Sequence, residues 1–589
     1  MNLTNNIVLL ETLRRDRDNS RNFLFTDPVE IITCHKPAEL QKCFQQMENC
    51  RGKGFYLAGF FAYEMGYFLE ESLRRHCPKI DYPLLWFGVY PEPLRRLPRN
   101  DKRENRSFFF SEPRLAIDFR QYEKAIRKIK TCIARGETYQ INYTSRYDFH
   151  FIGDIAGFYE NLKQSQKVSY SALIHFDGNA VISLSPELFF RIDSRGNIMV
   201  KPMKGTSPLA ATSSWLSHDA KNQSENVMIV DLLRNDLGRI CLPGSVRVKK
   251  LFEVEKYETL LQMTSTVTGR LRPQIKILDM VKSLFPCGSV TGAPKIRSMK
   301  IISDLEHGPR NIYTGAIGYF APDGQSVFNV AIRTIDLRRQ SGHKYQARMG
   351  VGGGIVFDSR PKNEFEECRL KGQFLTGTMP EFALIETMLL TDGKIKYLRR
   401  HLRRLKKTAR TFSIACPVDK IKTALNACAA KLSGRIRLRL LLKPDGNFLI
   451  QHHPVSPCPA SSPFVVVSRH KTNSGDPFLY HKTTHRKLYD EEFKRHSAQG
   501  YFDVVFQNEK DEITEGAISN IFILVKGRWY TPPLSCGLLN GIARQVMIRK
   551  LNAGEKILYL KDLKSADRIV LTNSVRGANT VNLKSERMK

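Results

Sequence analysis

The sequence predicts a mixed α+β protein of at least two domains, and three observations support this. The chain has 589 residues, more than a single hydrophobic core commonly supports. Segments with helical and with strand periodicity follow one another without strict alternation, which favours α+β over α/β. Gly377 to Pro380 reads as a short junction, after which a new pattern begins. We therefore predict one unit over 1–376, a junction at 377–380 and a second unit over 381–589.

Composition narrows the class of protein. The hydrophobic fraction is 42%, and no apolar run reaches membrane-spanning length. Met1 to Asn22 is charged and lacks the apolar centre of a signal peptide. Twelve cysteines occur without a C-x-x-C pair, which favours reduced thiols over a disulfide frame or a zinc site. We expect a cytoplasmic protein without a membrane partner.

The net charge of +34 raises the question of nucleic-acid binding. The basic residues are spread along the chain, and the densest run, Arg399 to Arg410, has the spacing of an amphipathic helix. No helix-turn-helix, zinc-finger or aromatic RNA-binding signature accompanies them. We expect an anionic substrate and no nucleic-acid partner. A non-catalytic, basic nucleic-acid-binding protein on recruited enzyme folds is the alternative from another class.

The elements of the first unit are predicted in order, although residues 1–118 carry little readable pattern. Arg120 to Ala134 has helical spacing, and Gly136 stops it. Residues 172–184 predict a hairpin that turns at Asp177 and Gly178, and strands follow at 188–192 and 198–200. Residues 225–234 predict a helix with Glu225 in its first turn, where a carboxylate favours the helix dipole.

The segment Lys201 to Pro208 carries the first candidate chemistry. We expect Lys204 on a tight turn beside Gly205, with Glu187 upstream and Glu225 downstream. A lysine and two carboxylates could supply a nucleophile, an acid and a metal ligand, provided that the pKa of the lysine is depressed. By itself, the segment favours an exposed surface lysine over a catalytic one, because lysine is almost always exposed.

Further blocks in a fixed order carry a resemblance to a family. They read Pro286-Cys-Gly-Ser-Val-Thr-Gly-Ala-Pro-Lys295, Tyr313-Thr-Gly-Ala-Ile-Gly-Tyr319, Ala331-Ile-Arg-Thr334, Gly352-Gly-Gly-Ile-Val356 and Glu364-Phe-Glu-Glu367. Together with Lys204, this order resembles the chorismate-utilising enzymes, whose fold is layered and built on large antiparallel sheets. The resemblance implies a site for chorismate and Mg²⁺.

The resemblance also implies roles for individual residues. Lys204 would be a nucleophile and Glu187 a general acid. The implied Mg²⁺ ligands are Glu225, Glu364 and Glu367. The implied substrate contacts are Thr291, Tyr313, Arg333, Gly352, Gly353, Gly354 and Lys371.

Two positions point to a subfamily. Pro202-Met-Lys-Gly-Thr206 resembles the aminodeoxychorismate synthases, whereas anthranilate synthases usually have alanine at the lysine position. Gln262 stands where many relatives have a histidine. No glutamine amidotransferase sequence is present, so ammonia would come from solution or from a separate amidotransferase subunit.

The second unit begins with an apolar segment at Phe382 to Met388, and a hairpin is predicted over 435–453 with its turn at Asp445. This half resembles the two-subdomain fold-type IV pyridoxal phosphate (PLP) enzymes. The resemblance implies Lys482 as the cofactor lysine and Glu515 as the partner of the ring nitrogen. It places the phosphate at Arg404, Gly541, Ile542, Ala543 and Thr572, with Thr387 near the substrate. These enzymes are commonly dimers, so a homodimer through this half is expected.

Combined, the halves predict 4-aminobenzoate synthesis for folate. Chorismate would be aminated to 4-amino-4-deoxychorismate, and a PLP-dependent lyase would then eliminate pyruvate. The alternative of the same class is an anthranilate or isochorismate synthase fused to an aminotransferase, because lyases and aminotransferases of fold type IV share nearly all these residues.

Overall fold

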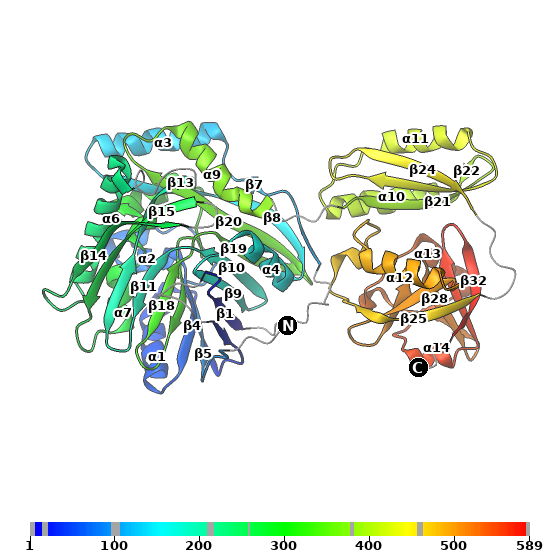
Figure 1. Cartoon of the computed structure of the whole chain (residues 1–589), viewed down its shortest axis with the longest axis horizontal. Coiled ribbons are helices and arrows are strands. Elements are labelled where there is room, and N and C mark those ends of the chain that lie inside the picture. Colours follow the sequence, from blue (N-terminus) through cyan, green and yellow to red (C-terminus); the bar gives the residue numbers. More distant parts are fainter. Residues whose placement is uncertain are drawn as a thin grey trace. The chain divides into compact units, whose positions relative to one another are not determined.

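The computed structural model describes residues 6–14, 22–95, 107–208, 217–256, 260–376, 382–455 and 463–584. The chain divides into two compact units. Unit 1 comprises 1–100, 113–150 and 159–378, and unit 2 comprises 101–112, 151–158 and 379–589. The predicted junction at 377–380 lies outside the described residues. Figure 1 colours the chain from blue at its N-terminus to red at its C-terminus.

Unit 1 is built around two large antiparallel sheets. The first has the order β16-β8-β20-β19-β10-β9-β1-β2, with β6 and β7 also paired to β8. Its strands are β1 (Ile7–Glu11), β2 (Phe23–Phe25), β7 (Arg114–Leu115), β8 (Gln140–Gly153), β9 (Tyr170–Phe176), β10 (Asn179–Ser185), β16 (Gly292–Ala293), β19 (Thr334–Ser341) and β20 (Lys344–Ile355). Strand β6 (Phe108–Phe110) and the end of β8 with which it pairs, Phe151 to Gly153, are counted with unit 2.

The second sheet has the order β13-β15-β12-β11-β18-β17-β4-β5-β3, with β14 also paired to β15. Its strands are β3 (Glu30–Cys34), β4 (Tyr56–Phe61), β5 (Leu85–Tyr90), β11 (Leu188–Ile192), β12 (Asn197–Lys201), β13 (Met203–Pro208), β14 (Arg247–Lys256), β15 (Leu260–Arg270), β17 (Ala316–Phe320) and β18 (Ser326–Val330). The large antiparallel sheets expected for this half are therefore present.

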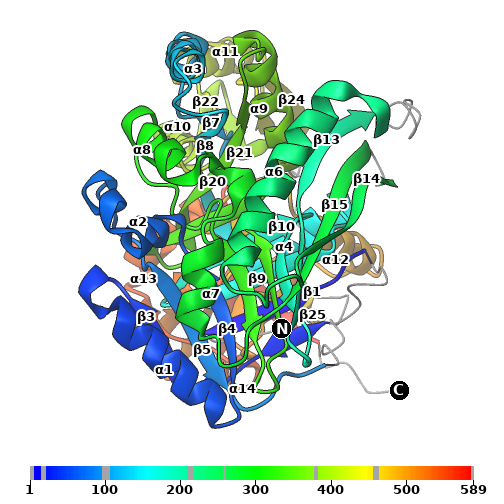
Figure 2. The same cartoon turned by 90° about the vertical axis from the view of Figure 1, so that its left-hand side faces the viewer.

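Two apolar layers hold unit 1 together. Side chains from both sheets, including Phe25, Trp86 and Phe176, form a core between the sheets. A second core lies between the other face of the second sheet and three helices, α1 (Leu40–Gly52), α6 (Ala220–Gly238) and α7 (Ile277–Leu284). Figure 2 shows these three helices from the side on which they lie. The remaining helices are α2 (Gly66–Leu69), α3 (Phe119–Ala134), α4 (Ile155–Ser165), α8 (Lys295–Leu305) and α9 (Pro361–Thr376). Short 3₁₀ turns span Pro37–Glu39, Tyr63–Met65, Glu71–His76 and Gly288–Val290.

Unit 2 contains two sheets. One has the order β22-β21-β23-β24 and consists of β21 (Leu384–Thr391), β22 (Lys394–Ile395), β23 (Arg435–Leu442) and β24 (Phe448–Pro454). Its apolar side packs with α10 (Leu398–Thr411) and α11 (Val418–Ala430), and the buried Leu402 and Leu405 confirm the amphipathic helix.

The other sheet has the order β27-β26-β25-β32-β31-β28-β29-β30. It consists of β25 (Phe464–Thr472), β26 (Asp503–Asn508), β27 (Ile513–Gly516), β28 (Asn520–Val525), β29 (Arg528–Thr531), β30 (Gly554–Glu555), β31 (Arg568–Asn573) and β32 (Gly577–Leu583). The accompanying helices are α12 (Lys487–Ser497), α13 (Ile542–Leu551) and α14 (Leu560–Lys564), and 3₁₀ turns span Pro477–Tyr480 and Leu534–Cys536.

Local predictions meet mixed outcomes. Helix α3 begins one residue before the predicted start, where Asp118 accepts a hydrogen bond from the Gln121 backbone N–H at 2.8 Å. The hairpins β9–β10 and β23–β24 are confirmed. Glu225 is not in a first turn, because α6 already begins at Ala220 behind its cap Asp219. The helix-dipole argument for Glu225 was therefore wrong.

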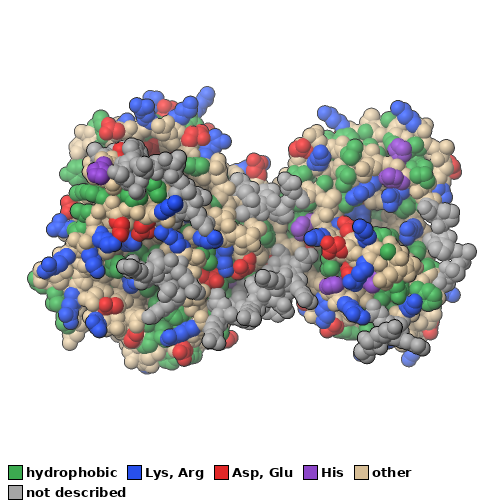
Figure 3. All heavy atoms as spheres, viewed as in Figure 1, with side chains coloured by type: hydrophobic (Ala, Val, Ile, Leu, Met, Phe, Trp, Pro, Cys, Tyr) green, Lys and Arg blue, Asp and Glu red, His purple; other side chains and the backbone are tan. Residues whose placement is uncertain are grey.

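The visible surface and the described helices bear on two partners that we did not expect, a nucleic acid and a membrane. Figure 3 shows lysine and arginine side chains scattered over the visible face between acidic and apolar ones. Such a mixed face offers no continuous basic stripe for a nucleic-acid backbone. Within the part of the chain that the structure describes, no helix combines the length and apolarity needed to cross a membrane.

Candidate active sites

Lys204 lies within strand β13, so its prediction as a turn residue is wrong. The strand pairs with β15, and the register shifts between Met203 and Thr206. Gly205 has φ of 82° inside this irregular stretch, which a residue with a Cβ rarely adopts. The side-chain amide of Gln262 on β15 donates a hydrogen bond of 2.9 Å to the Gly205 carbonyl. Lys204 therefore lies on an irregular strand, and a hydrogen bond from the neighbouring strand β15 holds that strand in place.

Charged groups from several elements surround the Lys204 ammonium. Desolvation lowers its pKa from the usual value, and the positive charge of Lys371 adds to that shift. The carboxylates of Glu225, Glu187 and Glu367 act in the opposite direction. The lysine therefore lies among carboxylates that favour its charged form, while its withdrawal from water favours the neutral amine.

Glu187 is a buried carboxyl group close to Lys204. Its side chain is 4% exposed and accepts a hydrogen bond of 2.7 Å from the Ser289 hydroxyl. Burial raises the pKa of Glu187 to about 7, against the opposing effects of Ser289 and Lys204. A carboxyl group that titrates near neutral pH can donate a proton, which is the property required of a general acid.

Helix α9 points acidic and basic side chains at strand β20. A Cβ added to Gly353 would lie 3.6 Å from Oε2 of Glu364, 3.8 Å from Nζ of Lys371 and 4.0 Å from Oε1 of Glu367. Lys371 donates to the Gly352 carbonyl at 2.7 Å and forms an ion pair with Glu367 at 2.7 Å. The absence of a side chain at Gly353 therefore leaves space bordered by two carboxylates and an ammonium.

Gly354 connects this space to the Lys204 region. A Cβ at Gly354 would lie 2.0 Å from Nε2 of Gln140 and 3.2 Å from Nζ of Lys204. The structure thus brings Lys204, Glu187, Glu225, Glu364, Glu367, Lys371 and Gly352 to Gly354 into one region. Within the described residues, however, no three of the metal-ligating side chain types form a metal-sized group.

The other implied substrate contacts have partners of their own. The Thr291 hydroxyl donates to the Cys287 carbonyl at 3.1 Å and is buried. Arg333, at φ 51°, donates from Nη1 to Oε1 of Gln166 at 3.0 Å. The geometry therefore does not place a free side chain of Thr291 or Arg333 beside Lys204.

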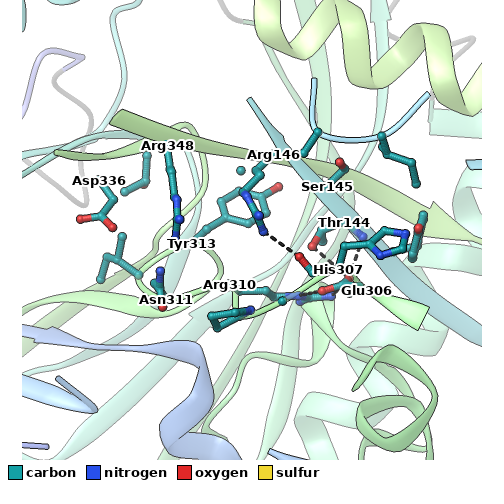
Figure 4. A pocket seen from close by; sticks show the side chains of 18 residues that line it. Thr144, Ser145, Arg146, Glu306, His307, Arg310, Asn311, Tyr313, Asp336 and Arg348 are labelled. Carbon is teal, nitrogen blue, oxygen red and sulfur yellow. Dashed lines mark hydrogen bonds and ion pairs between the residues drawn. The ribbon is translucent and has the colours of Figure 1, made fainter. Parts of the chain in front are cut away.

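Tyr313 borders a small cavity of about 40 Å³, shown in Figure 4. Its ring packs where a Cβ of Gly350 would be, 2.0 Å from Cγ. The floor is occupied by an ion pair of 2.7 Å between the buried Arg310 and Glu306. Arg310 also donates to the Asn142 carbonyl at 2.7 Å. Because this cavity is small and the ion pair fills its floor, we assign no ligand to it, and the predicted contact of Tyr313 with a substrate stays a prediction.

A cavity of about 490 Å³ opens in unit 2, within the range typical of ligand pockets. Lys482 lines it, and burial together with the nearby charges of Arg486 and Arg404 lowers the pKa of Lys482 to about 7. Glu515 also lines it, and burial raises the pKa of that carboxyl to about 8. With this pKa, a substantial fraction of Lys482 is neutral at pH 7, and a neutral lysine can condense with an aldehyde.

Arg404, the predicted phosphate ligand, is held by an acidic partner that the sequence did not reveal. It donates from Nε and Nη2 to the two oxygens of Glu386 at 2.9 and 2.7 Å. Nδ1 of His401 lies 2.6 Å from the same carboxylate. Burial opposes ionisation of Glu386, but Arg404 and His401 lower its pKa to about 2. Arg404 therefore lines the cavity as half of an ion pair.

The remaining predicted phosphate residues border the same cavity. Gly541 is the N-cap of α13, so the first backbone N–H groups of Ile542 and Ala543 face out of the helix end. A Cβ at Gly541 would lie 2.0 Å from Oδ1 of Asn520. Thr572 and Thr387 also line the cavity. All the predicted cofactor residues of this half thus meet at one cavity.

Residues 11–377 match the family model of the chorismate binding enzymes. The chain belongs to this family. Residues 383–582 match the model of the class IV amino-transferases. A class IV domain implies PLP as cofactor. The buried lysine and glutamate and the glycine-capped helix end provide groups that fit its aldehyde, ring nitrogen and phosphate.

Relatives of the chorismate binding family cover different shares of the chain. Aminodeoxychorismate synthase component 1 of Klebsiella aerogenes is 34% identical over 340 residues, which are 52% of this chain and 74% of that protein. Aminodeoxychorismate synthase of Streptomyces pristinaespiralis is 41% identical over 272 residues, 44% of this chain and 37% of that protein. The crystal structure of anthranilate synthase component I from Streptococcus pneumoniae aligns with a TM-score of 0.52 at 26% identity. That alignment covers 60% of this chain and 92% of that one.

Several polar residues at the family's site carried no predicted role. Ser289 holds Glu187, and Gln262 holds the Gly205 carbonyl. The Oε1 atom of the buried Gln140 has no hydrogen-bond partner among the described residues. Ser289 lies inside the block Pro286 to Lys295 that carried the resemblance, so its position was visible in the sequence. The contacts that Ser289 and Gln262 make, over more than 50 residues of chain, were not visible.

Proposed function

We propose that the chain makes 4-aminobenzoate from chorismate in two steps. Unit 1 would aminate chorismate at C4 to give 4-amino-4-deoxychorismate, and unit 2 would eliminate pyruvate from that product. The observation that carries the first step is the proximity of Lys204 and Glu187, each with a pKa shifted toward its neutral form. The names of the two synthase relatives, one covered to 74% and one to 37%, support the same reading.

In the first step Lys204 acts as nucleophile and Glu187 as acid. The neutral amine adds to C2 of chorismate while the C4 hydroxyl leaves, and Glu187 supplies the proton that makes it water. Ammonia then adds at C4 and expels the lysine, which restores the enzyme. Splitting the substitution into two covalent steps replaces one difficult displacement by two easier ones.

Substrate and metal would be held by the groups around Gly353. Glu225, Glu364 and Glu367 are the proposed Mg²⁺ ligands, because carboxylate oxygens suit this hard cation. Mg²⁺ would supply positive charge against the substrate carboxylate. Lys371 pairs with Glu367 at 2.7 Å, so the lysine and the metal compete for this carboxylate. Arg333, Tyr313, Thr291 and the backbone of Gly352 to Gly354 are proposed to contact chorismate.

In the second step Lys482 acts as base and acid. PLP, when bound, supplies an electron sink for the carbon that carries the amine. Glu515 would pair with the ring nitrogen, and Ile542, Ala543, Thr572 and Arg404 would border the phosphate. Lys482 would then remove the proton from the amine-bearing carbon, because its pKa of about 7 leaves much of it neutral at physiological pH. Thr387 is proposed to contact the substrate.

Partners follow from the chemistry. Unit 1 needs ammonia, and we propose that a separate glutamine amidotransferase delivers it. We also propose a cytoplasmic homodimer that associates through residues 381–589, with domain boundaries at 376 and 381.

One assay tests the function. Purified protein is incubated with chorismate, Mg²⁺, PLP and ammonium, and the products are separated by chromatography. We expect 4-aminobenzoate and one equivalent of pyruvate. Anthranilate or isochorismate would refute the first step. An accumulating aminodeoxychorismate, together with keto-acid formation from amino acids, would favour an aminotransferase in unit 2.

A further inference from the structure

Two arginines of strand β23 line the unit 2 cavity and have no assigned role. Arg437 and Arg439 are two residues apart, so their side chains leave the same face of the strand. Leu438 and Leu440, which alternate with them, are fully buried in the apolar core on the other face. Arg439 lies opposite Thr387 on β21. The small sheet thus presents two cations to the cavity wall.

Neither guanidinium is neutralised by a described residue. Within the described residues, no hydrogen bond or ion pair joins the side chain of Arg437 or Arg439 to another residue. The carboxylates that line the cavity are already engaged. Asp490 pairs with Arg486 at 2.8 Å, Asp476 caps the Phe478 backbone at 2.8 Å, and Glu515 accepts from the Leu539 backbone at 3.1 Å. Arg404, by contrast, is already paired with Glu386.

The two arginines also belong to a different part of the cavity from the proposed phosphate groups. Gly541 and Thr572 lie on the eight-stranded sheet and its helix α13, whereas β23 belongs to the four-stranded sheet. Arg404 is the exception, because α10 packs on the four-stranded sheet, but its guanidinium is already paired with Glu386. An anion held by β23 would therefore be distinct from a phosphate held at the start of α13. Side chains two residues apart on a strand begin about 7 Å from each other, a spacing that suits two carboxylates of one molecule.

We propose that Arg437 and Arg439 form a subsite for a small cyclic dicarboxylate, the substrate of unit 2. Each guanidinium forms hydrogen bonds with one carboxylate group, which is the geometry in which arginine binds most strongly. The inference deepens the proposed function, since 4-amino-4-deoxychorismate carries one carboxylate on its ring and one on its enolpyruvyl group. The pair selects against the monocarboxylates that a general aminotransferase accepts.

The test compares Arg437→Gln and Arg439→Gln with Arg435→Gln. Arg435 lies on the same strand and face but does not line the cavity, so it controls for general loss of positive charge. With aminodeoxychorismate as substrate, we expect KM to rise about 10- to 100-fold in each of the first two variants, because each loses a charge-assisted contact. Arg435→Gln should leave KM within about 2-fold, and kcat should change little in all three.

A direct binding measurement accompanies the kinetics. PLP-loaded protein is titrated with isophthalate, a dicarboxylate, and with benzoate, a monocarboxylate, and binding is followed by the visible absorbance of the cofactor. We expect isophthalate to bind the wild type more tightly than benzoate does, and this preference to disappear in Arg437→Gln and Arg439→Gln. PLP content and chorismate consumption should match the wild type, which establishes that the variants fold.

The possible results distinguish a failure of the proposed subsite from a failure of the proposed function. Unchanged KM and unchanged isophthalate binding in both variants would overturn the subsite. Loss of PLP content in the variants would also overturn it, because the arginines would then serve the cofactor. If the wild type leaves aminodeoxychorismate intact but binds isophthalate through both arginines, the dicarboxylate subsite stands and the proposed lyase reaction fails.

Discussion

Lys204 and Lys482 are lysines withdrawn from water, yet their surroundings differ in charge. Carboxylates of Glu225, Glu187 and Glu367 surround Lys204 and oppose the loss of its proton. Arg486 and Arg404 lie near Lys482 and assist that loss, which brings its pKa to about 7. The same side chain is therefore prepared differently in the two units. Burial and two arginines thus favour the neutral form of Lys482, whereas the carboxylates around Lys204 favour its charged form.

This difference has a chemical purpose under the proposed function. A lysine that condenses with an aldehyde must be neutral before the ligand arrives. A lysine that displaces a hydroxyl group benefits from an acid that protonates the leaving oxygen, and Glu187 lies beside it with a pKa near 7. The following predictions test whether the two lysines work independently, beginning with the largest expected effect.

Replacing Lys204 should cause the largest difference between the activities of the two units. In Lys204→Ala, 4-aminobenzoate formation from chorismate should fall by about 10⁴-fold, a loss typical of removing a nucleophile. Conversion of added aminodeoxychorismate to 4-aminobenzoate should stay at the wild-type rate. Lys201→Ala is the matched control, because Lys201 is a nearby lysine that forms an ion pair with Glu255. Full synthesis by Lys204→Ala would refute the nucleophile.

Replacing Lys482 should give the opposite pattern. In Lys482→Ala, release of pyruvate should fall by about 10³-fold, within the range for loss of a general acid–base group. Chorismate should still be consumed, so that 4-amino-4-deoxychorismate accumulates and chromatography detects it. A separate lyase added to the mixture should restore 4-aminobenzoate. If chorismate consumption stops as well, the two lysine sites are not independent.

The acid proposed for unit 1 should be visible in a pH profile. Glu187 is protonated below its pKa of about 7 and ionised above it, so kcat/KM for chorismate should decline as pH rises through 7. Glu187→Gln should lower kcat/KM by about 10²-fold and abolish this decline. The aminodeoxychorismate reaction of unit 2 serves as the control, because its profile should not change in the variant. A decline that persists in Glu187→Gln would assign the titration to another group.

The smallest expected effect concerns the hydrogen bond that holds the Lys204 strand. Gln262→Ala removes the donor to the Gly205 carbonyl, and one hydrogen bond is worth about 1 kcal/mol. We expect a 5- to 10-fold lower kcat for the chorismate step at nearly unchanged KM, with Gln262→Asn partly restoring it. If Gln262→Ala lowers the thermal stability but leaves kcat unchanged, Gln262 has a structural role only.

Sequence patterns predicted the periodic elements well and the irregular ones poorly. The apolar spacing in α3 and the Asp177–Gly178 turn are local signals, and the structure follows both. Lys204 was placed on a turn because Gly205 and Pro208 are also common in turns, but the neighbouring strand β15 imposes a bulge instead. That outcome depends on pairing with residues more than 50 positions away.

The candidate sites show the same division. The residues predicted from the motifs of unit 2 all line one cavity, and most of those of unit 1 lie around Lys204, but Thr291 and Arg333 are not placed there. The roles of all these residues stay predictions. The ion pair of Arg404 with Glu386 was not visible, because the two residues lie on different elements, α10 and β21. The Arg333–Gln166 hydrogen bond was missed for the same reason, whereas the Thr291–Cys287 hydrogen bond is local and lies within one sequence block.

Gly353 has a practical consequence for protein engineering. At Gly354 an added methyl group would lie 2.0 Å from Nε2 of Gln140, so that side chain would have to move. At Gly353 the nearest atom would be 3.6 Å away, an ordinary contact distance. The protein itself therefore has room for a methyl group at Gly353. Under the proposed function, that methyl group would occupy space needed by chorismate, so Gly353→Ala would block unit 1 and leave the reaction of unit 2 to be observed alone.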